Sequence, residues 1–203
     1  MKEVNPKETN RAVSYEYFID AQMPMVTIFK TIDVTNIINI SKGGYKFNML
    51  FCYCIVRAAM LIPEFKLLPI GKQLFEYDKL GINVIISNKH GHLSFCDLPY
   101  HQDMDIFNQD YLRLTKQVYE TCENYEIQDT MIVGTSALVK YDFDGVVNMY
   151  SGKLNNPFLA WGKYMVKDSR NLLKLSFQFH HVQMDGEQAC IFLDELQNQV
   201  QRL

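Results

Sequence analysis

The chain has 203 residues, 48% of them hydrophobic, which is enough for one packed domain and short for two, so we expect a single domain over residues 1–203. The formal net charge of −3 and the pI near 5.9 give no basic footprint for nucleic acid and no polybasic patch for a membrane surface. The five cysteines are scattered and odd in number, which favours a reducing cytoplasm over a framework of disulfides.

The expected elements mix strands and helices without a regular order. Hydrophobic periodicity predicts, in chain order, a strand at 25–32, helices at 34–40 and 50–61, a strand at 82–87 and a longer helix at 105–122. Strands then dominate from Met131 to Phe179, and a helix completes the chain. Because these elements do not repeat as βαβ units, we expect an α/β two-layer sandwich with a mixed β-sheet in place of a doubly wound fold.

Several short stretches suggest special functions but have simpler explanations. The apolar stretch 48–62 ends before Pro63 and is shorter than the ~20 residues that span a bilayer, so it indicates a buried helix. Within it, Cys52-Tyr53-Cys54 lacks the two-residue gap of a redox motif and is expected to pack in the core. His90-Gly91-His92 lies between two strand patterns and predicts a hairpin turn, so we expect no metal centre. Residues 1–11 are charged and polar, which predicts no signal peptide.

The C-terminal part of the chain contains the most regular strand pattern. Apolar and polar residues alternate strictly from Leu173 to Phe179, which predicts a half-buried strand. His181 continues the apolar phase, whereas His180 falls on the polar face. We therefore expect His181 in poorly hydrated surroundings, where burial disfavours the imidazolium and a neutral ring can act as a general base.

Two further residues follow this histidine pair. Asp185 stands just before a helical pattern, where an aspartate can cap free backbone N–H groups, and Gly186 permits a tight turn from strand to helix. The residues alone leave two interpretations open. His181 is either a catalytic base or a satisfied core histidine that precedes a capped turn.

The string His180-His181-x-x-x-Asp185-Gly186 resembles the signature of the chloramphenicol acetyltransferase family. A weaker version occurs in other coenzyme A-dependent acyltransferases, such as the dihydrolipoyl acyltransferase cores. The resemblance covers nearly the whole chain, because further segments keep the family's order: Asn10-Arg11, Tyr15-Glu16-Tyr17-Phe18, Tyr45-Lys46-Phe47, Thr135-Ser136-Ala137-Leu138 and Gly162-Lys163-Tyr164. The chain is identified as a member of this family, with the family's α/β fold.

The resemblance implies acetyl transfer from acetyl-coenzyme A to a hydroxyl group of a small molecule, with chloramphenicol or a similar compound as the first candidate and antibiotic resistance as the outcome. His181 would take the acceptor's proton and later return it to the departing thiol, without an acyl-enzyme. Asp185 resembles the family's structural aspartate, which pairs with an arginine near the N-terminus and holds the histidine segment in place. Arg11 aligns with that arginine; taken alone, it would be an exposed charge.

The resemblance also implies binding sites for both substrates. Lys46 and Lys163 fall where the family places lysines that approach the 3′-phosphate of coenzyme A, and Tyr164 falls where an aromatic residue lies against the nucleotide. Tyr17 and Phe18 lie in the region that helps to form the acceptor pocket. Taken alone, the lysines are equally explained as solvated surface residues and the aromatic residues as core. The family further implies a homotrimer with active sites between subunits.

The chain departs from the family where the oxyanion of the reaction should be stabilised. The family supplies a serine hydroxyl shortly after its Ser-Ala-Leu stretch, but residues 139–145 contain no serine, and Asp142 and Asp144 there predict an acidic turn. A family threonine is also replaced, by Ala160. Losing one oxyanion donor lowers the rate by about 10²–10³. Another acceptor, or a weakly active or non-catalytic protein that binds a small molecule or coenzyme A, therefore remains an alternative.

Overall fold

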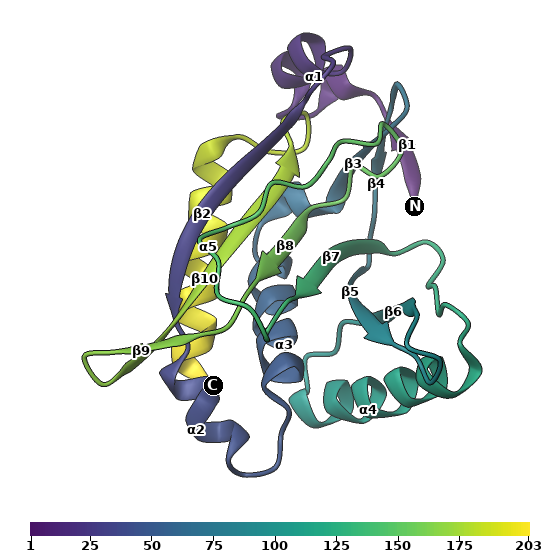
Figure 1. Cartoon of the computed structure of the whole chain (residues 1–203). Coiled ribbons are helices and arrows are strands. Elements are labelled where there is room, and N and C mark those ends of the chain that lie inside the picture. The colour runs from purple at the N-terminus through teal and green to yellow at the C-terminus, as the bar shows by residue number, and fades with distance from the viewer.

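The computed structural model describes residues 1–203, and its main feature is a seven-stranded sheet (Figure 1). Its strands are β2 (Met25–Asp33), β5 (Leu80–Ser87), β6 (Leu93–Pro99), β7 (Met131–Ala137), β8 (Phe158–Trp161), β9 (Met165–Lys167) and β10 (Arg170–His180). The order is β2-β10-β8-β7-β5-β6, with β9 also paired to β10. The β5–β7 and β7–β8 pairs are parallel and the others antiparallel, which confirms the expected mixed sheet.

Helices lie against this sheet, and a small second sheet stands near the N-terminus (Figure 1). The helices are α1 (Ala12–Phe18), α2 (Thr35–Ser41), α3 (Phe47–Met60), α4 (Met104–Thr121) and α5 (Gly186–Arg202), with short 3₁₀ helices η1 (Pro6–Glu8) and η2 (Pro63–Lys66). The small sheet has the order β1 (Lys2–Val4), β4 (Gln73–Glu76), β3 (Leu67–Ile70). The predicted helices are confirmed to within a few residues, and none of them is long and apolar enough to cross a membrane.

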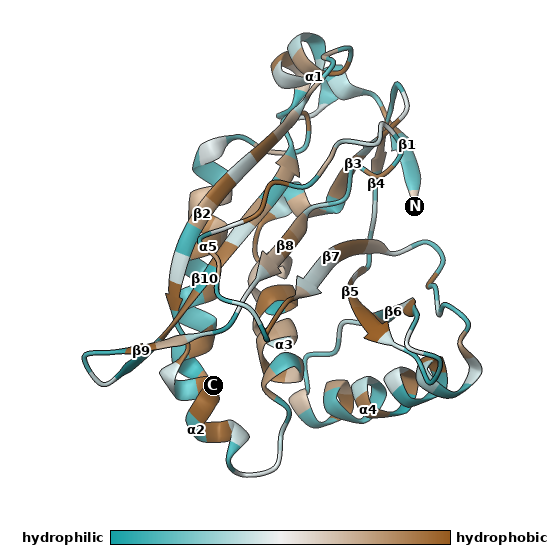
Figure 2. Cartoon of the chain, viewed as in Figure 1, coloured by the Kyte–Doolittle hydropathy of each residue, from teal (hydrophilic) through white to brown (hydrophobic).

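The centre of the fold is one cluster of 40 buried apolar residues, to which α3 contributes along almost its whole length. Phe51 of α3 packs edge-on against Trp161 of β8, with ring centroids 4.9 Å apart. Cys52 and Cys54 are fully buried, as expected, and burial raises the pKa of the Cys52 thiol to about 12. Unlike α3, helix α4 carries many hydrophilic residues, as the colouring in Figure 2 shows. The apolar stretch is therefore a buried core helix, as predicted.

From Leu175 to His180, strand β10 is buried on both faces, so the prediction of a half-buried strand was wrong there, whereas Lys174 earlier in the strand stays partly exposed as predicted. Its apolar set, Leu173 to Phe179, is fully buried as expected, yet Gln178 and His180 of the polar set are only 3% and 1% exposed. The reason is the segment 145–150, which lies over that face. The side-chain amide of Gln178 donates to the carbonyl oxygen of Asn148 at 3.1 Å, and the Tyr150 ring stands 6.5 Å from that of His180.

The segment His90-Gly91-His92 forms the turn of the β5–β6 hairpin, as predicted. Gly91 adopts a φ of +78°, a conformation that favours glycine. The side-chain oxygen of Asn88 accepts hydrogen bonds from the backbone N–H groups of His90 and His92, at 3.0 and 3.1 Å. The positions of His90 and His92 are thus explained by the hairpin turn.

Candidate active site

The predicted base lies in a short turn between β10 and α5. Strand β10 ends at His180, and the carbonyl oxygen of that residue accepts hydrogen bonds from the N–H groups of Gln183 and Met184, at 2.9 and 3.3 Å. The N–H of His181 donates to the carbonyl oxygen of Pro24 at 2.8 Å. The turn is therefore tied both to itself and to the chain segment that enters β2.

Asp185 stands at the N-cap position of α5, as predicted, and its backbone N–H donates to the side chain of Gln188 at 3.1 Å. The role predicted for Gly186 was wrong. Gly186 is the first residue of α5, its φ is not positive, and a Cβ added there would meet no atom within 4 Å. The turn is held by hydrogen bonds and does not need the conformational freedom of glycine.

Arg11 is the residue that holds the turn together. It is 2% exposed, and its Nη1 and Nη2 atoms donate to the two oxygens of Asp185, both at 2.8 Å. Nε donates to the carbonyl oxygen of Val182 at 2.9 Å, and Nη2 also reaches that of His181 at 3.0 Å. This charge-assisted, bidentate pairing holds the pKa of the Asp185 carboxyl below its usual range. The structure thus brings Arg11 and Asp185 together in the way that the resemblance implies.

The ring of His181 is held from two sides. Phe18 lies parallel to it, with ring centroids 4.0 Å apart and planes inclined by 8°. The buried Nδ1 atom lies 3.1 Å from Oδ1 of Asp185, although not in line for a hydrogen bond. The side chain as a whole is 30% exposed. Nε2 is therefore the nitrogen that can meet a substrate.

The predicted environments of the two histidines are corrected by this geometry. The His181 side chain is half-buried, whereas His180 is the buried histidine, and burial lowers the pKa of His180 to about 4. The alternation of strand faces does not extend to His181, because β10 ends one residue earlier. His180 is buried because the segment 145–150 covers the face on which it lies.

The three residues predicted to bind coenzyme A lie in a second group. Lys46 precedes α3, and the next residue, Phe47, has its ring 6.1 Å from that of Tyr164. The backbone N–H of Lys163 donates to the carbonyl oxygen of Tyr141 at 2.8 Å. Both lysines are exposed, and neither ammonium group forms an ion pair with a carboxylate. The Phe47–Tyr164 contact thus brings the residues next to both lysines together from segments far apart in the sequence, while the Lys46 ammonium itself lies over the Tyr111 ring, 5.9 Å from its centroid.

The two groups lie at opposite ends of the sheet. Met165, next to Tyr164, pairs with Leu172 at one end of β10, whereas His181 follows the other end. At about 3.3 Å per residue, the stretch from Leu172 to His180 spans roughly 26 Å. In Figure 1, β10 runs towards α1, while β9 and the start of α3 lie at the opposite end. One chain does not place the two groups in contact.

The residues predicted for the acceptor pocket both lie near His181, but in different environments. The Phe18 ring stacks on the imidazole, whereas Tyr17 is 73% exposed, with its ring 6.3 Å from that of Phe18. Sequence reasoning missed Ser14, whose hydroxyl donates to Oδ1 of Asp185 at 3.2 Å. It also missed Gln183, which is fully buried and donates to the carbonyl oxygen of Leu67 at 2.6 Å. No sequence signal distinguishes either residue from an ordinary polar one.

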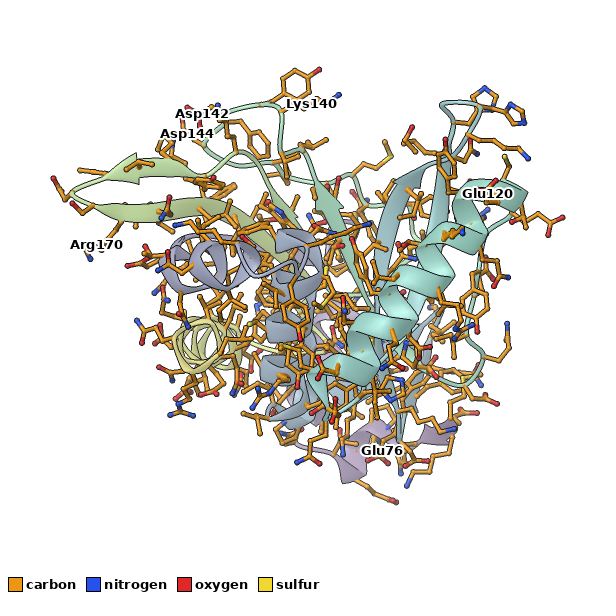
Figure 3. The ribbon with its side chains drawn as sticks, turned by 90° about the horizontal axis from the view of Figure 1, so that it is seen from below. Glu76, Glu120, Lys140, Asp142, Asp144 and Arg170 are labelled. Carbon is orange, nitrogen blue, oxygen red and sulfur yellow. The ribbon has the colours of Figure 1, made fainter.

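The acidic segment predicted at Asp142 and Asp144 is exposed and paired with a lysine. The ammonium group of Lys174 lies 2.6 Å from Asp144 and 3.8 Å from Asp142, and it lowers the pKa of Asp144. Figure 3 shows both aspartates beside the β9–β10 hairpin. Ala160, which replaces the family's threonine, is buried in β8. Neither position offers a hydroxyl group to an oxyanion.

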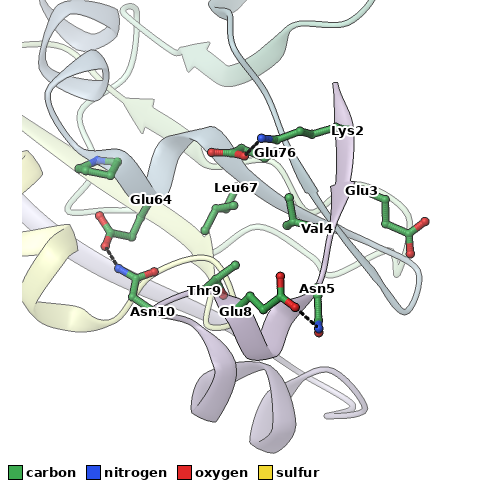
Figure 4. A pocket seen from close by; sticks show the side chains of 11 residues that line it. Lys2, Glu3, Val4, Asn5, Glu8, Thr9, Asn10, Glu64, Leu67 and Glu76 are labelled. Atoms are coloured by element: carbon green, nitrogen blue, oxygen red, sulfur yellow. Dashed lines mark hydrogen bonds and ion pairs between the residues drawn. The ribbon is translucent and has the colours of Figure 1, made fainter.

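A hollow of the surface lies elsewhere, near the N-terminus. It has a volume of about 600 Å³ and is lined by four glutamates, two of which, Glu64 and Glu76, contact Asn10 and Lys2 (Figure 4). None of the predicted site residues lines it.

Comparisons with known proteins agree with the fold and the motif. The sequence model of chloramphenicol acetyltransferase matches residues 2–197. Chloramphenicol acetyltransferase 2 of Escherichia coli is 27% identical over 164 residues, which cover 78% of this chain and 76% of that protein.

Among solved structures, a chloramphenicol acetyltransferase superposes with a TM-score of 0.84 at 20% identity, over 98% of this chain and 100% of the other. A dihydrolipoamide acetyltransferase of Azotobacter vinelandii has a TM-score of 0.67 at 19% identity, over 98% and 91%. These structures confirm the predicted fold, and the sequence model decides the family. The chain belongs to the chloramphenicol acetyltransferase family and is an acyltransferase.

Proposed function

We propose that the protein is an O-acetyltransferase that moves an acetyl group from acetyl-coenzyme A to a hydroxyl group of a small molecule, with His181 as the general base. The observation that carries this proposal is the geometry of the His181 ring. Phe18 stacks on its face, Asp185 lies beside the buried Nδ1, and Arg11 anchors the backbone on which it stands. This support leaves Nε2 free to meet a hydroxyl group.

The reaction follows from that arrangement. Nε2 of His181 accepts the proton of the acceptor hydroxyl while its oxygen attacks the carbonyl carbon of the thioester. The tetrahedral oxyanion then collapses, the carbon–sulfur bond breaks, and the imidazolium returns the proton to the departing thiolate. Because both substrates meet at one base, no acyl-enzyme forms. Arg11 and Asp185 take no proton in this scheme; they hold the turn in place.

A related solved structure supports the spacing of this motif. In the dihydrolipoamide acetyltransferase of Azotobacter vinelandii, a serine, a histidine and an asparagine four positions after that histidine have been investigated for their role in the catalytic mechanism. In this chain, Asp185 stands four positions after His181. The carboxylate of Asp185 uses both of its oxygens on Arg11, which fits a positioning role.

We propose that Lys46, Lys163 and Tyr164 bind coenzyme A. The two lysines carry no competing carboxylate, and an ammonium group can serve the 3′-phosphate as a compact point charge. The ring of Tyr164 is 36% exposed and packs near Phe47, so it offers an aromatic surface to adenine.

We also propose that the active enzyme is a homotrimer with its active sites between subunits, as the family resemblance implies. The separation of roughly 26 Å along β10 supports it, because the base of one chain lies far from that chain's own coenzyme group. A neighbouring copy can present its coenzyme group to the base instead. Size-exclusion chromatography with light scattering tests this proposal, and an active monomer would contradict it.

Chloramphenicol or a similar compound is the proposed acceptor, with Tyr17 and Phe18 as contacts. Acetylation in the cytoplasm, which the five free cysteines favour, would then confer resistance to the antibiotic. The absence of a serine in residues 139–145 and the exposed Asp142 and Asp144 support two alternatives: a different acceptor, or a protein that binds coenzyme A without turnover.

Thiol release from acetyl-coenzyme A in the presence of chloramphenicol and a panel of hydroxylated compounds tests the function. We expect release with at least one acceptor, and its loss in His181→Ala with an unchanged melting temperature. Release that persists in His181→Ala would contradict the assignment of the base. No release with any acceptor, together with measurable coenzyme A binding, would favour the non-catalytic alternative.

A further inference from the structure

The peptide unit that follows His181 is held at both of its ends by side chains. Its carbonyl oxygen, on His181, accepts a hydrogen bond from Nη2 of Arg11 at 3.0 Å. Its N–H group, on Val182, donates to Nδ1 of His180 at 3.1 Å and has no backbone acceptor. Val182 is fully buried and its bond to His180 is buried, so water does not replace the imidazole as acceptor there.

His180 is well suited to accept this hydrogen bond. An imidazole accepts through Nδ1 only when it is neutral and carries its proton on Nε2. Burial of His180, which is 1% exposed, lowers its pKa to about 4, so the ring is neutral at physiological pH. The residue ends β10 opposite Met25 of β2, and the Tyr150 ring stands against its own. The acceptor atom is thus fixed by the sheet and by packing.

The direction of the His181 side chain depends on this peptide unit. The N–H of His181 is bonded to Pro24, and the next peptide unit is anchored by Arg11 and His180, so the backbone on both sides of its Cα is fixed. A rotation of that peptide unit would move the ring away from Phe18 and Asp185. In enzymes a displacement of about 1 Å can lower the rate by about 10²-fold.

We propose that His180 is a positioning residue for acetyl transfer: by accepting the N–H of Val182, it sets the direction in which the imidazole of His181 points. This inference rests on the proposed function, in which His181 is the base. His180 itself touches neither substrate in this proposal. His180 holds the peptide unit by accepting from its N–H group, and Arg11 holds it by donating to its carbonyl oxygen.

Two substitutions of His180 distinguish the effect of its hydrogen bond from the effect of its packing. His180→Phe fills a similar volume but leaves the Val182 N–H buried without an acceptor. His180→Asn keeps an oxygen acceptor at the same number of bonds from Cα as Nδ1. We expect His180→Phe to lower kcat by about tenfold or more, and His180→Asn to remain within about threefold of the wild type. The KM for acetyl-coenzyme A should not change in either variant, because Lys46 and Tyr164 lie at the other end of the sheet.

Nitrogen-15 spectra of the imidazoles of the unmodified protein give a second measurement that needs no activity. We expect His180 to show a neutral ring with its proton on Nε2 at pH 7. A wild-type kcat in His180→Phe would overturn the proposal, and so would a proton on Nδ1 of His180. An equal loss of kcat in His180→Asn and His180→Phe, at unchanged melting temperatures, would do the same. Failure of the proposed function is distinct, since the wild type would then show no His181-dependent thiol release.

Discussion

The interaction with the clearest energetic consequence is the pairing of Arg11 with the turn that carries His181. Replacing Arg11 with methionine keeps most of the apolar stem and removes all four hydrogen bonds of the guanidinium group, two to Asp185 and one each to the carbonyl oxygens of His181 and Val182. The guanidinium is the only permanently charged cation in contact with the Asp185 carboxylate.

The expected loss follows from burial. Breaking a buried ion pair by removing one partner costs about 3–5 kcal/mol. The Arg11 side chain is 3% exposed, but that of Asp185 is 42% exposed, so water relieves part of the penalty at the carboxylate. We therefore expect the lower end, about 3 kcal/mol of unfolding free energy. For a chain of this size, that corresponds to a fall of roughly 6–12 °C in Tm.

Thermal unfolding of Arg11→Met, followed by circular dichroism and compared at equal protein concentration, measures this loss. Arg113→Met is the matched control, because Arg113 pairs with Asp110 on the surface, where its side chain is 61% exposed. Exposed pairs contribute about 0–1 kcal/mol, so the control should stay close to the wild type. If Arg11→Met unfolds within about 1 kcal/mol of that control, Arg11 does not hold the turn, and the reasoning fails.

Three further outcomes are expected. Lys46→Ala and Lys163→Ala should each raise the KM for acetyl-coenzyme A about tenfold with little change in kcat. The reason is that a hydrogen bond to a charged group contributes about 1.5–3 kcal/mol. An unchanged KM in thiol-release kinetics would show that these lysines do not bind coenzyme A. Phe18→Leu should lower kcat by roughly three- to tenfold through loss of the aromatic contact, at a similar Tm, and a wild-type kcat would show that the stacking has no role. The folded-state pKa of His180 lies below its unfolded value, so the unfolded chain binds more protons. The free energy of unfolding should therefore fall by about 3 kcal/mol as the pH is lowered from 6.5 to about 4, and level off below that. Denaturant titrations should show this fall in the wild type and not in His180→Asn.

Local patterns were sufficient to predict most of the elements. The apolar periodicity of residues 50–61 predicted a helix because nearly every position of α3 contacts the core. The mixed sheet followed from the irregular order of strands and helices. The environments of His180 and His181 were predicted wrongly for a physical reason. A strand pattern shows neither the residue at which pairing ends nor a distant segment, here residues 145–150, that covers the polar face.

The contacts of the site were beyond the reach of local patterns. The resemblance predicted that Arg11 pairs with Asp185, but its hydrogen bonds to two carbonyl oxygens depend on where α1 packs. The same holds for Phe18, which was predicted to contact the acceptor and stacks on His181. Residues 11 and 185 are brought together by the whole fold, so their geometry follows from tertiary structure alone.

The separation of the base from the coenzyme group leads to a test by complementation. If each active site combines His181 of one chain with Lys46 and Lys163 of its neighbour, then two variants fail for different reasons. A chain that lacks the base is inactive, and a chain that lacks both lysines is nearly inactive at acetyl-coenzyme A concentrations far below its raised KM. In a mixed trimer, some interfaces join the intact base of one variant to the intact lysines of the other. A site within one chain offers no such combination.

The expected recovery can be calculated from random assembly. Mixing His181→Ala with the double variant Lys46→Ala and Lys163→Ala in equal amounts, by joint refolding, makes each contributor intact at half of the interfaces. About a quarter of the sites in a cyclic trimer then contain both intact groups. At an acetyl-coenzyme A concentration below the wild-type KM, thiol release should therefore reach about a quarter of the wild-type rate. Release no greater than the sum of the two parent variants would show that the base and the lysines of one chain act together. His181 and the lysines of one chain would then have to approach each other across the roughly 26 Å length of β10. The pairing of β10 to β2 and β8 opposes such a movement.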